Sequence, residues 1–101
     1  MRHPDVDIAA DGTATLVYGR QPFGSPQALV ARRRIPGVGW TRPTTVTGEG
    51  YAHTLGVDRA GNATLVFSPD FTSVRAAFRP ADGRWRTPER ISPAGAQVDD
   101  F

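Results

Sequence analysis

Short runs of alternating apolar and polar residues, broken by glycine and proline, extend along the whole 101-residue chain. In residues 4–10, Val6 and Ile8 alternate with Asp5 and Asp7, which is the period of two that is typical of a half-buried β-strand. No stretch of the sequence places apolar residues at the i, i+3, i+4 and i+7 positions of an amphipathic helix. Nine prolines and eleven glycines mark frequent turns, so the pattern predicts an all-β chain.

This pattern occurs twice. Residues 11–18 (Asp-Gly-Thr-Ala-Thr-Leu-Val-Tyr) return 49 positions later as residues 60–67 (Ala-Gly-Asn-Ala-Thr-Leu-Val-Phe). Trp40, which precedes Thr-Arg-Pro, returns 45 positions later as Trp85, which precedes Arg-Thr-Pro. The difference of four residues fits an extra loop in the first copy, around residues 21–24. Repeats of this length that consist of short strands are typical of propeller blades.

Alignment of the two copies predicts four strands in each. The expected strands of the first copy are residues 4–10, 13–18, 28–34 and 40–46. Those of the second copy are residues 52–58, 62–67, 73–79 and 85–91. The second strands are apolar on both faces at Leu16-Val17 and Leu65-Val66, which is typical of a sheet that lies between neighbouring sheets.

We therefore predict an all-β fold of two consecutive four-stranded antiparallel propeller-like blades. The first blade is expected over residues 1–48 and the second over residues 49–92. Residues 93–101 form a tail that resembles the start of a third copy. Two blades can cover only one face of each other, so the remaining apolar faces predict a homo-oligomer or a longer repeat array. The alternative is a two-sheet sandwich whose outer faces are partly polar.

The order of motifs within each copy carries a family resemblance. An apolar strand, an Asp-Gly or Ala-Gly turn and a strand ending in an aromatic residue are followed by a third strand, a glycine-containing turn and Trp-x-x-Pro. This order resembles the sialidase-like, Asp-box-type propeller repeats of bacterial exported proteins over essentially the whole chain. The turns depart from the family's box, because Asp82, Gly83 and Trp85 are closely spaced and the turn before Trp40 lacks an Asp. The resemblance implies a four-stranded blade per copy, a ring of blades in a full-length member, and export.

Composition excludes several classes of site. The chain has no cysteine, so it can form neither a disulfide nor a thiolate metal site. All twelve basic residues are arginine, which gives a calculated isoelectric point near 9.9 although the net charge is only +2. That small excess, without basic helices or stacking aromatic residues between the arginines, predicts no nucleic-acid partner. No apolar run has the length of a membrane span or the form of a signal peptide, so the sequence predicts no membrane partner and leaves localisation open.

Candidate catalytic residues are few. The resemblance to sialidases would require three arginines that clamp a carboxylate, a Tyr–Glu nucleophile pair and an Asp acid/base. Tyr51 lies near Glu49 in the sequence, but this pair without the clamp and the acid does not make a glycosidase. His3 and His53 are the only imidazoles and have no further ligand cluster. We therefore predict no enzyme activity, no metal and no cofactor.

The run Arg32-Arg33-Arg34 is a candidate ligand site. Alternation along a strand directs Arg33 to one face and Arg32 and Arg34 to the other. Phe78 occupies the position of Arg33 in the second copy, so this position is either exposed or specialised. A guanidinium presented there could bind a carboxylate or phosphate through two hydrogen bonds. The alternative is an outer strand whose solvated charges discourage aggregation.

Trp40 and Trp85 are further candidates, because aromatic faces stack on the apolar faces of sugars. The alternative is that a tryptophan repeated in register fills the gap between blades. We predict a non-catalytic binding module with a glycan or protein ligand. The candidate ligand-binding residues are Trp40, Trp85, Arg32, Arg33 and Arg34. The alternative functions are a fragment of a sialidase-like glycoside hydrolase and a purely structural repeat scaffold.

Overall fold

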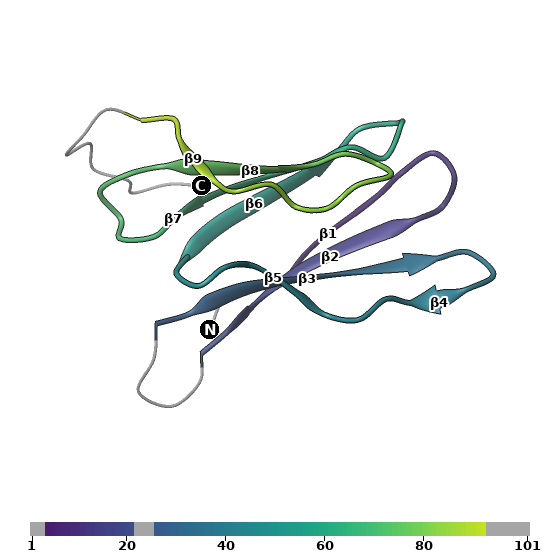
Figure 1. The fold of residues 1–101 in the computed structure, drawn as a ribbon, viewed down its shortest axis with the longest axis horizontal. Coiled ribbons are helices and arrows are strands. Elements are labelled where there is room, and N and C mark those ends of the chain that lie inside the picture. The colour runs from purple at the N-terminus through teal and green to yellow at the C-terminus, as the bar shows by residue number, and fades with distance from the viewer. Residues whose placement is uncertain (1–3, 22–25, 93–101) are drawn as a thin grey trace.

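The computed structural model describes residues 4–21 and 26–92, which form two antiparallel β-sheets (Figure 1). Sheet one contains β1 (Asp5–Ile8), β2 (Ala14–Arg20), β3 (Ala28–Ile35), β4 (Gly39–Trp40) and β5 (Thr44–Thr47). Sheet two contains β6 (Ala52–Val57), β7 (Ala63–Ser68), β8 (Arg75–Arg79) and β9 (Glu89–Arg90). The predicted all-β character is confirmed, and within the described residues no helix is long and apolar enough to cross a membrane. The predicted tail 93–101, His3 and most of the loop expected at 21–24 lie outside the described residues.

The outer strand of sheet one differs from the expectation. A single fourth strand was predicted over residues 40–46, whereas β4 and β5 are separate and both pair with β3, so that sheet one has five strands. Pro43 lies between β4 and β5, and a proline has no N–H to donate to the ladder. In sheet two, Pro88 similarly precedes β9, which is shorter than the predicted strand 85–91. The proline after each tryptophan therefore limits the outer strand of each sheet.

The strand register repeats along with the sequence. Val6 pairs with Leu16 in sheet one, and Leu55 pairs with Leu65 in sheet two, 49 positions later. A hydrogen bond of the connecting segment is also repeated. The Thr41 amide donates to the Arg33 carbonyl at 2.8 Å, and the Arg86 amide donates to the Phe78 carbonyl at 2.8 Å, 45 positions later. The two copies that the sequence predicts therefore share one pattern of strand pairing.

The turns after the two first strands are built alike. Gly12 and Gly61 have φ angles of 89° and 95°, a region that glycine enters without steric cost. Two backbone hydrogen bonds close each turn. The Ala9 amide donates to the Thr13 carbonyl at 2.9 Å and the Gly12 amide to the Ala9 carbonyl at 3.0 Å. In the second turn the Asp58 amide donates to the Asn62 carbonyl and the Gly61 amide to the Asp58 carbonyl, both at 3.0 Å. These turns give the first two strands of each sheet the same register.

The two sheets pack against each other, and the buried apolar residues between them come from both sheets. The core consists of Val17, Leu29, Ala31, Val46, Leu65, Phe67 and Ala77. Gly50, in the segment that links the sheets, lies so close to Leu29 and Phe67 that an added Cβ would be 2.7 Å and 3.1 Å from their nearest side-chain atoms. A side chain at position 50 would therefore push the sheets apart.

The first strands of the two sheets lie side by side (Figure 1). Asp5 Oδ2 lies 2.5 Å from Nδ1 of His53, whose side chain is almost fully buried. Two residues along β1, Asp7 Oδ2 accepts a hydrogen bond from the Val57 amide at 2.8 Å. Alternate acidic residues of β1 thus join it to β6, and the outer strands of the two sheets face the opposite end of the gap.

Candidate functional site

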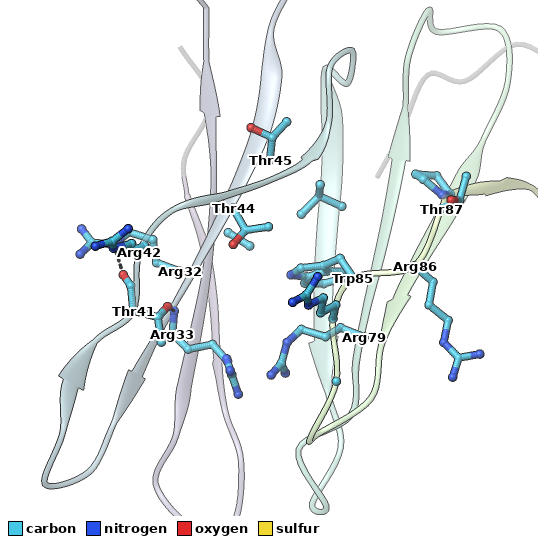
Figure 2. A pocket seen from close by; sticks show the side chains of 15 residues that line it. Arg32, Arg33, Thr41, Arg42, Thr44, Thr45, Arg79, Trp85, Arg86 and Thr87 are labelled. Carbon is cyan, nitrogen blue, oxygen red and sulfur yellow. Dashed lines mark hydrogen bonds between the residues drawn. The ribbon is translucent and has the colours of Figure 1, made fainter.

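A cleft of about 560 Å³ opens between the outer parts of the two sheets (Figure 2). Its walls come from β3, the segment from Thr41 through β5, the end of β8 at Arg79, and the segment that connects β8 to β9. Six arginines line it, namely Arg32, Arg33, Arg42, Arg79, Arg84 and Arg86. Four threonines line it as well, namely Thr41, Thr44, Thr45 and Thr87. No aspartate or glutamate is among the described residues of the lining, so the cleft carries a concentrated positive charge.

Arg33 and Arg79 point toward each other across the cleft from opposite sheets (Figure 2). Arg33 pairs with Thr15 on the face of sheet one that meets sheet two, and Arg79 pairs with Ala63 on the facing side of sheet two. Arg79 is only 4% exposed, and Arg33 is half-buried. The Arg79 guanidinium donates one long hydrogen bond, of 3.3 Å from Nη2, to the Ala81 carbonyl.

Neither guanidinium has a carboxylate partner among the described residues. Burial, followed by the positive charge of Arg33, lowers the pKa of the Arg79 guanidinium below its ordinary value, while Asp82 acts in the opposite direction. A buried charge is unfavourable unless it is paired, and two like charges that face each other add to that penalty. The two arginines therefore form an electrostatically unsatisfied site at the base of the cleft.

A smaller cavity of about 200 Å³ lies between the sheets near the turns at Gly12 and Gly61. Among the residues that the structure describes, Arg33 and Arg79 alone line both the cleft and this cavity. The two guanidinium groups thus stand at the boundary of the two spaces, so a ligand could reach them without displacement of the core.

Two other arginines of the lining are engaged with aromatic rings. The guanidinium carbon of Arg32 lies 5.4 Å from the centre of the Trp40 ring, and Arg32 Nε donates to the Thr41 carbonyl at 3.0 Å. The guanidinium carbon of Arg86 lies 5.8 Å from the centre of the Phe78 ring. Figure 2 shows Arg32 and Arg86 directed away from the space between Arg33 and Arg79. Because neither Trp40 nor Phe78 lines the cleft, these two cation–π contacts direct both guanidinium groups away from its interior.

The two candidate tryptophans occupy different places. Trp85 is half-buried, packs against the core and lines the cleft (Figure 2). Trp40 is 48% exposed and is not among the residues that line the cleft. Arg34, which pairs with Trp40 across the strands, is exposed and also lies outside the lining. The structure thus brings Arg33 and Trp85 together, with Arg32 at the wall, and leaves Trp40 and Arg34 elsewhere.

Arg79 was not among the candidates from the sequence, although it is the most buried arginine of the site. Its counterpart in the first copy is Arg34, 45 positions earlier, which belonged to the conspicuous arginine run. The available signal was strand alternation, which places Arg79 and Phe78 on opposite faces of β8. Which face of β8 meets Arg33 depends on how the two sheets stack, and this information is not in the local sequence.

The Asp5–His53 pair lies at the first strands, outside the lining of the cleft. His53 Nε2 is buried and has no hydrogen-bond partner among the described residues. Within residues 4–21 and 26–92, no group of three or more His, Asp or Glu side chains is placed to hold a metal ion. The pair is therefore a contact between the two sheets and contributes no residue to the cleft.

No protein-family model, curated protein or solved structure matches this chain. The function is accordingly argued from the geometry and charge of the cleft.

Proposed function

We propose that this chain is a non-catalytic binding module that takes a carboxylate-bearing glycan in the cleft between its two sheets. The observation that carries the proposal is the convergence of Arg33 and Arg79, one from each sheet, without a carboxylate partner among the described residues. An anion between them would supply the missing counter-charge to both. A charge-assisted hydrogen bond to a guanidinium contributes about 1.5–3 kcal/mol, so the pair favours an anionic ligand strongly over a neutral one.

The remainder of the lining favours a sugar as the carrier of that anion. Trp85 contributes part of an indole ring, which can pack against the apolar face of a pyranose. Threonine hydroxyls on both walls can donate to or accept from sugar hydroxyls. A volume of about 560 Å³ accommodates part of a short oligosaccharide, because small-molecule pockets run from about 300 to 1,000 Å³.

The cleft favours binding over hydrolysis. Glycoside hydrolysis uses two carboxylates that flank the scissile bond, and the described lining offers neither Asp nor Glu. Arginine, threonine and tryptophan side chains can hold an anionic sugar, but they are poor general acids and bases at neutral pH.

The arrangement of the two sheets as successive blades of a propeller-type repeat is part of this proposal. The repeated register and the side-by-side first strands support it. In such an arrangement the cleft lies between the outer strands of neighbouring blades. The ligand would then contact both repeats at once, as the positions of Arg33 and Arg79 require.

Isothermal titration calorimetry with matched ligands tests the proposal. We expect a trigalacturonate to bind saturably and the neutral galactotriose to bind at least tenfold more weakly, because one lost charge-assisted contact exceeds about 1.4 kcal/mol. Sialyllactose against lactose gives a second matched pair, and inorganic phosphate and sulfate report whether a free anion suffices. Equal affinity for the acidic and neutral sugars would refute the proposal.

A further inference from the structure

The two sheets contact each other through faces that are not equivalent positions of the repeat. Leu65 enters the core from sheet two, and its counterpart in sheet one, 49 positions earlier, is Leu16. Leu16 lies on the outer face of sheet one, because its neighbour Val17 points into the core. Likewise, the counterpart of Val17 is Val66, which lies on the outer face of sheet two, opposite Leu65. The contact between the sheets is therefore head to tail, and each sheet has one face that repeats a buried face of the other.

The outer face of sheet one repeats the face by which sheet two is buried. Its residues are Val6, Ile8, Ala14, Leu16, Tyr18, Val30, Arg32 and Arg34. Val6 and Ile8 are 61% and 62% exposed, whereas their counterparts Leu55 and Val57 are half-buried against sheet one. The aliphatic side chains of β1 are therefore exposed, although sheet one covers the equivalent side chains of the second repeat.

The outer face of sheet two repeats the face by which sheet one is buried. Its residues are Thr54, Gly56, Thr64, Val66, Ala76 and Phe78. These are small or apolar apart from two threonines, and Phe78 is 41% exposed. Both halves of the contact between the sheets are thus presented a second time, on opposite sides of the molecule.

We infer that a second copy of this chain docks head to tail, with the outer face of its sheet two on the outer face of sheet one. The template is the contact inside the chain, because Val6, Ile8 and Leu16 repeat the apolar positions of Leu55, Val57 and Leu65. The new contact differs from the template at its polar positions. Thr54 and Gly56 replace the Asp5 and Asp7 that bond to sheet two, and Arg32 stands where the core has Ala77. The surfaces differ in kind, so the association is heterologous and continues until a ring closes. This inference goes beyond the binding proposal, because the cleft lies within one chain and does not need a second copy.

The new contact lacks the like-charge pair of its template. Inside the chain, Arg33 faces Arg79, and the two positive charges oppose each other. Between copies, the counterpart of Arg33 is Phe78 and the counterpart of Arg79 is Arg34. The like-charge pair of the template is therefore replaced by an arginine and an aromatic ring, which Arg86 of the same chain already contacts.

Light scattering on a sizing column tests the inference. We expect the chain to elute above its monomer mass of 10.9 kDa, at three or four times that mass if the ring closes with six or eight sheets. The substitutions Ile8→Asp and Phe78→Asp should each reduce the mass to that of a monomer. Val38→Asp is the matched control, because Val38 is 79% exposed in the turn between β3 and β4 and lies on neither outer face. Circular dichroism confirms that each variant is folded, and Val6→Asp and Thr64→Asp replace any variant that is not.

A mixing experiment distinguishes a head-to-tail contact from a symmetric one. The Ile8→Asp variant retains the outer face of sheet two, and the Phe78→Asp variant retains the outer face of sheet one. An equimolar mixture should therefore form a dimer of twice 10.9 kDa, whereas each variant alone remains a monomer. The inference is overturned if the unmodified chain is a monomer at all concentrations. It is also overturned if the mixture gives no dimer or if Val38→Asp dissociates the assembly as strongly.

Discussion

Arg33 of β3 and Arg79 of β8 face each other across the gap between the two sheets, and within residues 4–21 and 26–92 they alone line both the cleft and the smaller cavity beside it. The two arginines are not equivalent positions of the repeat, because the counterpart of Arg33 is Phe78 and the counterpart of Arg79 is Arg34. They face each other only because the two sheets stack. Stacking brings the inward-facing arginine of each repeat to the same gap. Both charges lose hydration there, Arg79 more than Arg33, and this opposes folding where no counter-charge is supplied.

Replacement of Arg79 by methionine should separate binding from stability. We expect Arg79→Met to abolish binding of the acidic glycan while the free energy of unfolding rises by about 1 kcal/mol, because an unpaired buried charge is replaced by an apolar side chain of similar length. Urea unfolding and calorimetry measure the two effects. Arg34→Met is the matched control, since Arg34 is the exposed counterpart in the first repeat and should change neither quantity. A loss of more than about 1 kcal/mol in Arg79→Met would show that the arginine stabilises the fold instead.

The two tryptophans should differ in their effect on binding. Trp85→Ala should weaken binding at least tenfold and also lower the free energy of unfolding, because Trp85 both lines the cleft and packs against the core. Trp85→Phe preserves most of the apolar contact and isolates the contribution to the ligand. Trp40→Ala should leave the affinity unchanged, because Trp40 is outside the lining. An equal loss of affinity in Trp40→Ala would place the glycan on the outer face of sheet one and not in the cleft.

Gly50 should control the distance between the sheets. Gly50→Ala places a Cβ 2.7 Å from Leu29 Cδ1, so we expect a loss of about 1–3 kcal/mol in the free energy of unfolding. Gly48→Ala is the matched control, because nothing lies within 4 Å of a Cβ at that position. Chemical denaturation of both variants measures the difference. If both variants have the same free energy of unfolding, the Leu29 side chain moves to accommodate the added Cβ without a loss of stability, and the prediction is wrong.

The turn carboxylates should make the fold sensitive to acid. Hydrogen bonds from the amide and hydroxyl of Thr13 lower the pKa of Asp11, and those from the side chain and amide of Asn62 lower the pKa of Asp58. A carboxyl group whose pKa is lower in the folded chain stabilises the fold above its unfolded pKa and loses this effect as the pH falls through its folded pKa. The free energy of unfolding should therefore decline as the pH falls below about 4. Asp58→Asn should show a shallower decline in denaturation experiments from pH 5 to pH 2, and an unchanged slope would contradict this assignment.

The fold follows largely from local sequence patterns. Period-two alternation and the repeated Gly12 and Gly61 turns are properties of short segments, which is why the strands and their order could be predicted. The outer strands were predicted less well. Pro43 separates β4 from β5, because a proline cannot donate to the ladder, although Thr41 still forms hydrogen bonds with Arg33 of β3.

The site could be predicted only in part. The arginine run identified Arg33, since strand alternation alone separates it from Arg32 and Arg34. Arg79 could not be assigned in the same way, because its role depends on which face of sheet two meets sheet one. That choice is a property of the stacking of the sheets, and it is set by residues such as Leu29 and Phe67, which lie far apart in the sequence.

The most direct test of the cleft is an NMR titration that follows the side-chain Nε–Hε signals of the arginines. On addition of trigalacturonate at constant ionic strength, we predict saturable shifts for Arg33 and Arg79, with smaller shifts for Arg34 and Arg20 outside the cleft. Galactotriose should leave all of these signals in place. Uniform small shifts of every arginine, or shifts at Arg34 in place of Arg33 and Arg79, would contradict binding of an acidic glycan between the two sheets.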